Sequence, residues 1–258
     1  MGASTATLSR PVRPGLVWEL VLRNLRLRYR RSMLGLLWAQ ITPLAYVLVL
    51  TIVFTRIVPL DIDDYPVFVL LGMLPWLWFH AALVAGATSV VDAPDLVRHP
   101  GFPRLALPLV AVVSTLVNHL LGLPVALVGA AIVTGRLHAS ALALLPLLAI
   151  QLLLCLGPAY ALASLHARLR DTAHLLGVVL VPLFYATPVF YDADALDAAP
   201  ALRLNPLVPV INGYRDAVLE GRWPALVPLA AVTGAGLVLL AAGLALYRAR
   251  MPRFVEDL

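Results

Sequence analysis

PVFVLLGMLPWLWFHAALVAGATSVV, residues 66–91, is a run of 26 residues without a single Asp, Glu, Lys or Arg. A helix needs about 20 mainly apolar residues to cross the hydrocarbon core of a bilayer. The whole chain shares this character, since 61% of its residues are hydrophobic and 13% are charged. A soluble domain typically carries about 25% charged residues, so lipid must surround most of this chain. We therefore expect an all-α integral membrane protein.

Hydropathy predicts six transmembrane helices in a single membrane domain that occupies residues 1–258. The expected spans are residues 36–58, 66–91, 105–134, 141–165, 172–190 and 224–247. The fifth is the shortest and is interrupted by Pro182 and Pro188, whereas the third is long enough to tilt in the bilayer. Residues 1–15 form an N-terminal tail ahead of these segments.

The segment LVWELVLRNLRLRYRR, residues 16–31, lies ahead of the first span. Apolar residues at helical spacing share one of its faces, namely Trp18, Leu22, Leu25 and Tyr29. This pattern predicts an amphipathic helix over residues 16–33 that lies in the inner membrane interface. Its arginines are either a simple positive anchor or, for Arg28, Arg30 and Arg31, ligands for the phosphates of an anionic lipid-linked substrate.

The distribution of arginine predicts the orientation of the chain. Of the 19 arginines, 14 fall on the side of the N-terminus once six spans are drawn. Cytoplasmic loops carry the excess of basic residues, so both termini are expected in the cytoplasm. We expect a multi-pass protein of the bacterial cytoplasmic (inner) membrane.

All 19 basic residues are arginine, and the chain contains no lysine. A phosphate-binding loop of the G-x-x-x-x-G-K-[ST] kind needs its lysine, so this chain cannot bind ATP in that way. If ATP drives the protein, ATP and Mg²⁺ must be held by a separate subunit. The six histidines are dispersed, so we expect no metal site. We also expect no cofactor on this chain and no enzymatic activity, since ATP hydrolysis would belong to the separate subunit.

Two polar segments interrupt the apolar pattern. Residues 92–103 connect the second and third spans on the cytoplasmic side. Residues 191–223 lie outside and fit two short helices, around Ala193–Ala199 and Val210–Leu219. Ile211, Tyr214 and Val218 share one face of the second, which suggests that it dips into the outer interface or leans over a pore mouth.

Histidine and aromatic residues are the notable groups within the spans. His80 and His119 fall near the middles of the second and third spans, where they either hydrogen-bond between helices or relay protons. The lack of Asp and Glu in every span favours the structural role. Six aromatic residues either line a channel or gate for sugars or simply pack in the membrane. They are Trp76, Trp78, Phe79, Tyr185, Phe190 and Tyr191.

Three stretches together carry a resemblance: LRNLRLRYRRSMLGLLWAQITPL (22–44), LVRHPGFPRLALPL (96–109) and NPLVPVINGYRDAVLEG (205–221). The chain resembles the permease subunits of ABC-2-type polysaccharide exporters, which move O-antigen, capsule and teichoic acid precursors. The resemblance implies six spans and a homodimer that works with two copies of an ABC ATPase. It further implies that residues 92–103 form a coupling helix and that residues 191–223 form outer gate helices.

In such a coupling helix, the residues expected to meet the ATPase are Asp95, Arg98, Phe102 and Arg104. His99, Pro100 and Gly101 depart from the usual pattern of the family, and a turn there would shorten the helix. The expected function is export of a lipid-linked polysaccharide, with membrane lipids and the glycan as ligands and no nucleic acid. The alternatives are an ABC-2 permease for a drug or small lipid and a proton-coupled carrier; an intramembrane enzyme ranks last, since no catalytic motif is present.

Overall fold

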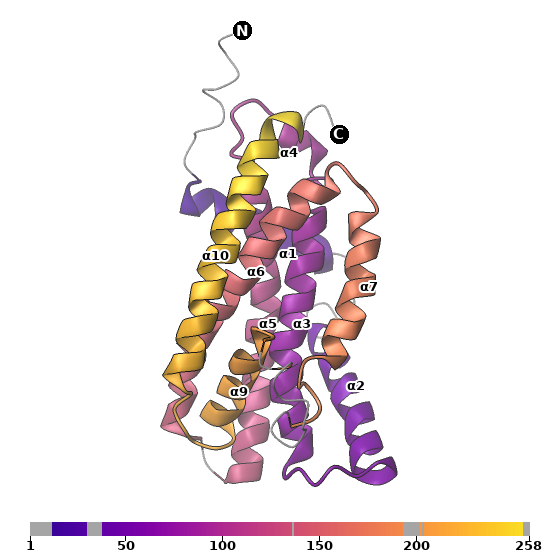
Figure 1. The fold of residues 1–258 in the computed structure, drawn as a ribbon, viewed down its shortest axis with the longest axis vertical. Coiled ribbons are helices and arrows are strands. Elements are labelled where there is room, and N and C mark those ends of the chain that lie inside the picture. Colours follow the sequence, from indigo (N-terminus) through magenta and orange to yellow (C-terminus); the bar gives the residue numbers. More distant parts are fainter. Residues whose placement is uncertain (1–11, 30–37, 136, 193–201, 203, 255–258) are drawn as a thin grey trace.

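The computed structural model describes residues 12–29, 38–135, 137–192, 202 and 204–254, and all regular structure within these ranges is helical. The helices form an elongated bundle (Figure 1). The short helix α4 (Pro94–Arg98) and the end of α10 (Leu226–Arg250) lie at one end, which we call the α4 end. The helix α9 (Leu207–Val218) lies toward the opposite end, which we call the α9 end.

Five helical segments are long and apolar enough to cross a membrane. They comprise α2 (Trp38–Ile52) with the π-helical turn η3 (Val53–Ile57), α3 (Tyr65–Thr88), α5 (Ala106–Thr134), η4 (Ala139–Ala143) with α6 (Leu144–His166), and α10 with η5 (Met251–Arg253). These helical segments coincide to within a few residues with the first, second, third, fourth and sixth expected spans.

The fifth expected span, residues 172–190, is wrong in its last part. Helix α7 covers only Thr172–Tyr185, which is 14 residues. At 1.5 Å per residue it is about 21 Å long, less than the roughly 30 Å of a hydrocarbon core. Pro188 has no backbone N–H and disfavours helical geometry at Thr187, so the chain does not continue as a helix to residue 190.

Helix α3 is the centre of the bundle. Buried residues make up 72% of its most apolar stretch but only 11% of that of α2. It packs against α2, α5, α6, α7 and α9. Helices α6 and α10 form the most extensive helix pair, and their backbones approach closely because Gly157 and Gly243 face each other across the contact. Small residues at such positions allow van der Waals packing that lipid cannot replace.

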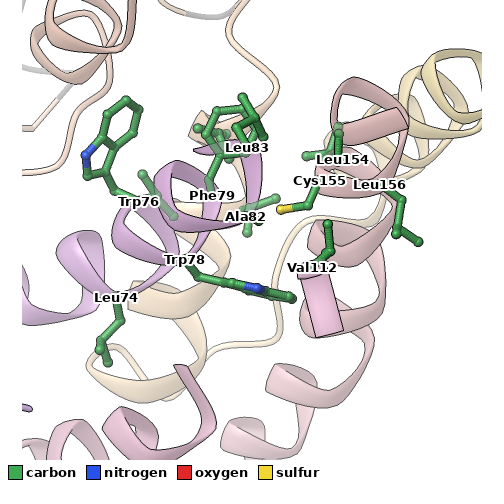
Figure 2. Close-up of a cluster of buried hydrophobic side chains, with 14 of the residues drawn as sticks. Leu74, Trp76, Trp78, Phe79, Ala82, Leu83, Val112, Leu154, Cys155 and Leu156 are labelled. Atoms are coloured by element: carbon green, nitrogen blue, oxygen red, sulfur yellow. The ribbon is translucent and has the colours of Figure 1, made fainter. Parts of the chain in front are cut away.

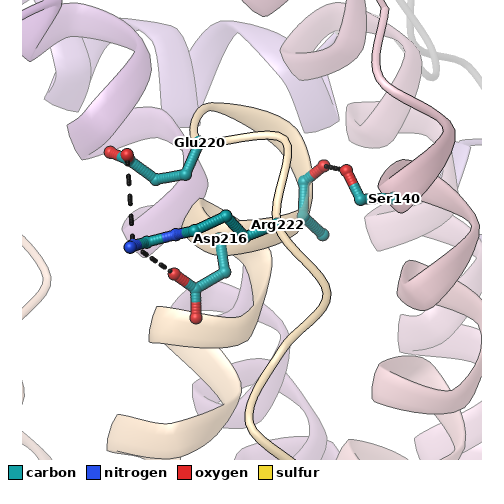
Figure 3. A network of polar contacts seen from close by, with 5 residues as sticks. Ser140, Asp216, Glu220 and Arg222 are labelled. Carbon is teal, nitrogen blue, oxygen red and sulfur yellow. Dashed lines mark hydrogen bonds and ion pairs between the residues drawn. The ribbon is translucent and has the colours of Figure 1, made fainter.

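Helix α9 is part of the core rather than a cover over it. It packs against α3, α6 and η4, and the expected face of Ile211, Tyr214 and Val218 is fully buried. At the end of the helix, the Ser140 hydroxyl donates to the carbonyl oxygen of Ala217 over 2.7 Å (Figure 3). The other outer helix, expected around residues 193–199, lies outside the described residues.

Helix α1 (Pro14–Tyr29) corresponds to the expected interface helix over residues 16–33, of which residues 30–33 lie outside the described part. It lies along α5, where Val21 packs against Ala106 and Val110. Trp18 stays exposed and is available to lipid. The helix is therefore anchored to the bundle along one side and free to meet the membrane on the other.

The helix expected to couple to the ATPase is shorter than the twelve-residue segment 92–103 would allow. Helix α4 spans only Pro94–Arg98, and His99 is extended with a ψ of 122°. Pro100 imposes this geometry on the residue before it. Gly101 then adopts a φ of 81°, which suits glycine alone, so the turn HPG ends the helix.

Candidate functional site

Helix α4 presents a polar surface at its end of the molecule. Val97 is buried and anchors the helix, whereas Asp95 and Arg98 are exposed. Phe102 is half-buried and packs against the main hydrophobic core. The structure thus places Asp95 and Arg98 where a partner protein can contact them, with Phe102 beneath the adjoining turn.

Arg104 differs from these residues because its side chain turns inward. Its Nε donates a 3.0 Å hydrogen bond to the carbonyl oxygen of Val97, and its guanidinium reaches the carbonyl oxygen of Met251 over 3.5 Å. Arg104 therefore joins the last turn of α4 to the end of α10. The sequence carries no signal for this orientation, because a basic residue in a cytoplasmic loop is normally expected to face solvent.

The arginines expected to bind phosphate fall at the edge of what the structure describes. Arg28 belongs to α1, but its side chain lies outside the described part of the chain, as do Arg30 and Arg31. Arg23, one turn earlier, is exposed and lines a cavity of about 600 Å³ between α1, α3, α5 and residues 92–96. Phosphate binding by Arg28, Arg30 and Arg31 stays a prediction.

Five of the six aromatic residues expected to line a channel belong to one continuous series of ring contacts. The series runs from η3 through the residues after α7 and the end of α7 to α3, and the contact of Phe184 with Phe190, at 5.6 Å, links its two halves. Ring centroids are 5.4 Å apart for Trp76–Phe184 and for Phe54–Phe190, and 5.1 Å apart for Phe190–Tyr191. Phe79 joins at Trp76, and Tyr185 joins at Phe190. We call this series the aromatic ladder.

Trp78 lies apart from the aromatic ladder. Trp76 and Trp78 are two positions apart on α3, so their side chains point in different directions (Figure 2). Trp78 points toward Val112 of α5 and stacks on His119, with ring centroids 4.9 Å apart. Trp78 therefore packs α3 against α5. The other five aromatic residues lie together and are better placed for the expected channel.

His119 is the centre of a buried hydrogen-bond network. Its Nδ1 lies 3.1 Å from the carbonyl oxygen of Leu74, and its Nε2 lies 2.9 Å from the Tyr214 hydroxyl. The carbonyl can only accept, so Nδ1–H donates to it, and Nε2 of the neutral ring accepts from Tyr214. At the next residue of α3, the carbonyl oxygen of Pro75 accepts a 2.6 Å hydrogen bond from the Gln151 side chain of α6. These bonds join α3, α5, α6 and α9, as the structural role expected for His119 requires.

Replacing Tyr214 by phenylalanine tests this network. The variant keeps the ring but leaves Nε2 of buried His119 without its donor, which should cost about 1–2 kcal/mol of stability. We expect a lower midpoint of thermal unfolding in detergent. Tyr185→Phe is the matched control, because the Tyr185 side chain is exposed. Equal midpoints for the two variants would contradict the network.

His80 stands in a more open environment than His119. It is exposed, and it lines both the 600 Å³ cavity and a second cavity of about 360 Å³ between α2, α3 and α5. The two cavities meet at His80 and Ala81. A polar side chain at this position can contact a ligand that enters from the α4 end.

Comparison with known proteins identifies the family. The ABC-2 type transporter family matches residues 15–219. The chain is 34% identical over 95% of both chains to the O-antigen export system permease protein RfbA of Myxococcus xanthus. It is 26% identical to the protein of that name from Klebsiella pneumoniae, over 92% of each chain. The polysialic acid transport protein KpsM of Escherichia coli is 28% identical over 91% of this chain and 93% of its own.

The family match covers nearly all of α1, the segment 92–103, the aromatic ladder and the whole of α9, and the relatives align over nearly their whole lengths. The helical bundle has the apolar spans that a membrane component of a transporter requires. The chain therefore belongs to the ABC-2 type transporter family.

Proposed function

We propose that this protein is the permease subunit of an ATP-driven exporter that moves a lipid-linked polysaccharide across the bacterial inner membrane. The observation that carries the proposal is the 34% identity to an O-antigen export permease over 95% of both chains. The similarity to a polysialic acid transport protein extends the support to a second kind of polysaccharide. One relative is named for export of O-antigen and the other for transport of polysialic acid, and neither is named for transport of a drug.

A separate ABC ATPase supplies the energy in this proposal. The chain contains no lysine, so it has no phosphate-binding loop of the usual kind. The α4 end carries the exposed Asp95 and Arg98 together with the basic end of α10, and excess basic charge marks the cytoplasmic side. The ATPase therefore docks at the α4 end, and both termini lie in the cytoplasm.

The glycan passes along the face formed by α2, α3 and α7, in a homodimer of permeases with two ATPase subunits. The aromatic ladder follows this face, and sugars present apolar surfaces that pack on aromatic rings. Helices α2 and α7 expose many large apolar side chains that a second copy would cover, among them Tyr46, Val49, Val178 and Val181. The lipid phosphates enter beside α1, where arginines and the 600 Å³ cavity lie together.

Purification of the permease with its bound partners tests the proposal. We expect an ATPase with a phosphate-binding loop to co-purify in a one-to-one ratio, and mass spectrometry to find lipid-linked sugar in the complex. A complex that contains a drug or a simple lipid instead of lipid-linked sugar would favour an ABC-2 exporter of that compound. Transport by the lone chain, driven by a pH gradient, would contradict the proposal.

The coupling surface predicts a specific defect. Combining Arg98→Glu with Phe102→Ala should leave membrane insertion intact while uncoupling ATP hydrolysis from export, because both residues lie at the expected docking surface. We expect export to fall by about tenfold, the consequence of losing roughly 1.4 kcal/mol of productive contact. His138→Ala, at the α9 end, is the control. Normal export by the double variant would show that docking does not use these residues.

A further inference from the structure

Four hydrogen bonds meet around Arg104: one closes the segment 92–105 on itself, and three fasten this segment to the rest of the bundle. Two come from the Arg104 side chain, to the carbonyl oxygens of Val97 and Met251. The third comes from the Tyr247 hydroxyl of α10, which donates to the carbonyl oxygen of Arg104 over 2.8 Å. In the fourth, the Tyr160 hydroxyl of α6 donates to the carbonyl oxygen of Leu105 over 2.9 Å. We call this set of bonds the Arg104 clasp.

The clasp is partly buried and lies beside aromatic rings. Tyr247 is fully buried, with its ring centroid 5.3 Å from that of Tyr160 and 5.0 Å from that of Phe254. Hydrogen bonds in such surroundings are protected from competing water and hold their partners in one geometry. The end of α10, the end of α6 and the turn after α4 therefore form one packed unit.

The clasp gives movement of α4 a route to helices that are not its neighbours along the chain. The segment 92–105 is continuous in sequence with α3 and α5, so a push on α4 acts on these helices directly. Helices α6 and α10 have no such covalent link to α4. They are closely packed on each other through Gly157 and Gly243, so a connection to one of them moves both.

We propose that Arg104 is a positioning residue that ties the coupling helix to the end of α10, and through the packing of α10 on α6 also to α6, so that a push on α4 moves α3, α5, α6 and α10 together. The inference rests on the proposed function, since it assumes an ATPase that acts on α4. It differs from a docking role for Arg104, because the side chain faces the bundle and not a partner. The forked guanidinium suits this task, since it donates to two separate carbonyl oxygens at once.

The test uses the complex of permease and ATPase, with Arg104→Gln as the main variant. Glutamine is too short to reach both carbonyls and cannot replace the fork. We expect the ATPase to bind and to hydrolyse ATP as in the wild type, while export falls by about tenfold. A change of this size corresponds to the loss of one charge-assisted hydrogen bond between the coupling helix and α10. Arg253→Gln removes an exposed arginine at the same end and should export normally.

A distance measurement separates coupling from simple destabilisation. Spin labels at Asp92→Cys and Ala249→Cys, both exposed, report the separation of the coupling segment from α10. The native Cys155 is fully buried and inert to labelling. We expect the distance to stay constant on adding ATP when Arg104 is present, and to change on adding ATP in Arg104→Gln.

Each result decides between defined alternatives. Normal export by Arg104→Gln, or an ATP-dependent distance change that is the same with and without Arg104, would overturn the inference. Loss of ATPase binding in Arg104→Gln would assign the residue to docking and likewise overturn it. If Arg104→Gln fails to fold, Tyr247→Phe removes only one bond of the clasp and is measured in the same way. A wild-type chain that binds no ATPase would contradict the proposed function itself.

Discussion

Gly157→Leu is expected to abolish the folded bundle. A β-carbon at this position would lie 2.5 Å from the carbonyl carbon of Leu239 and 2.6 Å from the backbone nitrogen of Leu240. These atoms belong to the backbone of α10, so no side-chain rotation relieves the overlap. Helices α6 and α10 would have to separate along the most extensive helix contact in the described structure. The cost should exceed about 3 kcal/mol, the upper part of the usual range for overpacking.

Gly234→Leu is the matched control, because Gly234 lies on α10 and has nothing within 4 Å of a built β-carbon. Size-exclusion profiles and midpoints of thermal unfolding in detergent would measure both variants. We expect a normal monodisperse peak for Gly234→Leu and little or no folded Gly157→Leu. A stable Gly157→Leu protein would show that close packing of α6 on α10 does not hold the bundle together.

Hydropathy predicted most of the fold because lipid imposes a simple rule on the chain. Every backbone polar group in the membrane must be satisfied within its own helix, so each long apolar run became a helix. Helix α7 departs from the rule at Thr187 and Pro188, where proline chemistry ends the helix before the apolar run ends. The short α4 has the same cause at Pro100, and there the turn HPG was visible in the sequence.

The contacts of single polar residues were less predictable. His119 and Tyr214 are far apart in sequence, and hydropathy carries no information on which helices meet. In the sequence, only the lack of acidic residues in the spans favoured a structural role for His119 over a proton relay. Arg104 was expected to meet the ATPase, and Arg215 falls within the expected outer helix Val210–Leu219, yet both side chains turn inward to backbone carbonyls. Charge patterns thus predict the side of the membrane but not the direction of a side chain.

Arg215→Leu should detach the segment after α7 from the core. Arg215 is the one buried Arg, Asp or Glu in the described part of the chain. Its guanidinium donates to the carbonyl oxygen of Val189 over 2.8 Å and lies 3.5 Å from the ring centroid of Phe68. Burial lowers the pKa of Arg215 to about 9, so the group stays positively charged at neutral pH. Leucine would leave the carbonyl of Val189 unpaired and shift Phe190 of the aromatic ladder.

We expect Arg215→Leu to lower stability by about 2 kcal/mol, the worth of a hydrogen bond to a charged group together with a cation–π contact. Arg222→Leu is the control on the same side of the membrane (Figure 3): its 3.0 Å bridge to Asp216 is exposed and should contribute less than about 1 kcal/mol. Gly72→Ala offers a second check, because its β-carbon would overlap the Val189 carbonyl oxygen and lie 2.8 Å from the Arg215 guanidinium, which disrupts the hydrogen bond between these two groups. Unfolding midpoints should therefore fall for Arg215→Leu and Gly72→Ala but not for Arg222→Leu. If Arg215→Leu is as stable as the wild type, the cost of burying the charge cancels its contacts, and Arg215 does not hold this segment in place.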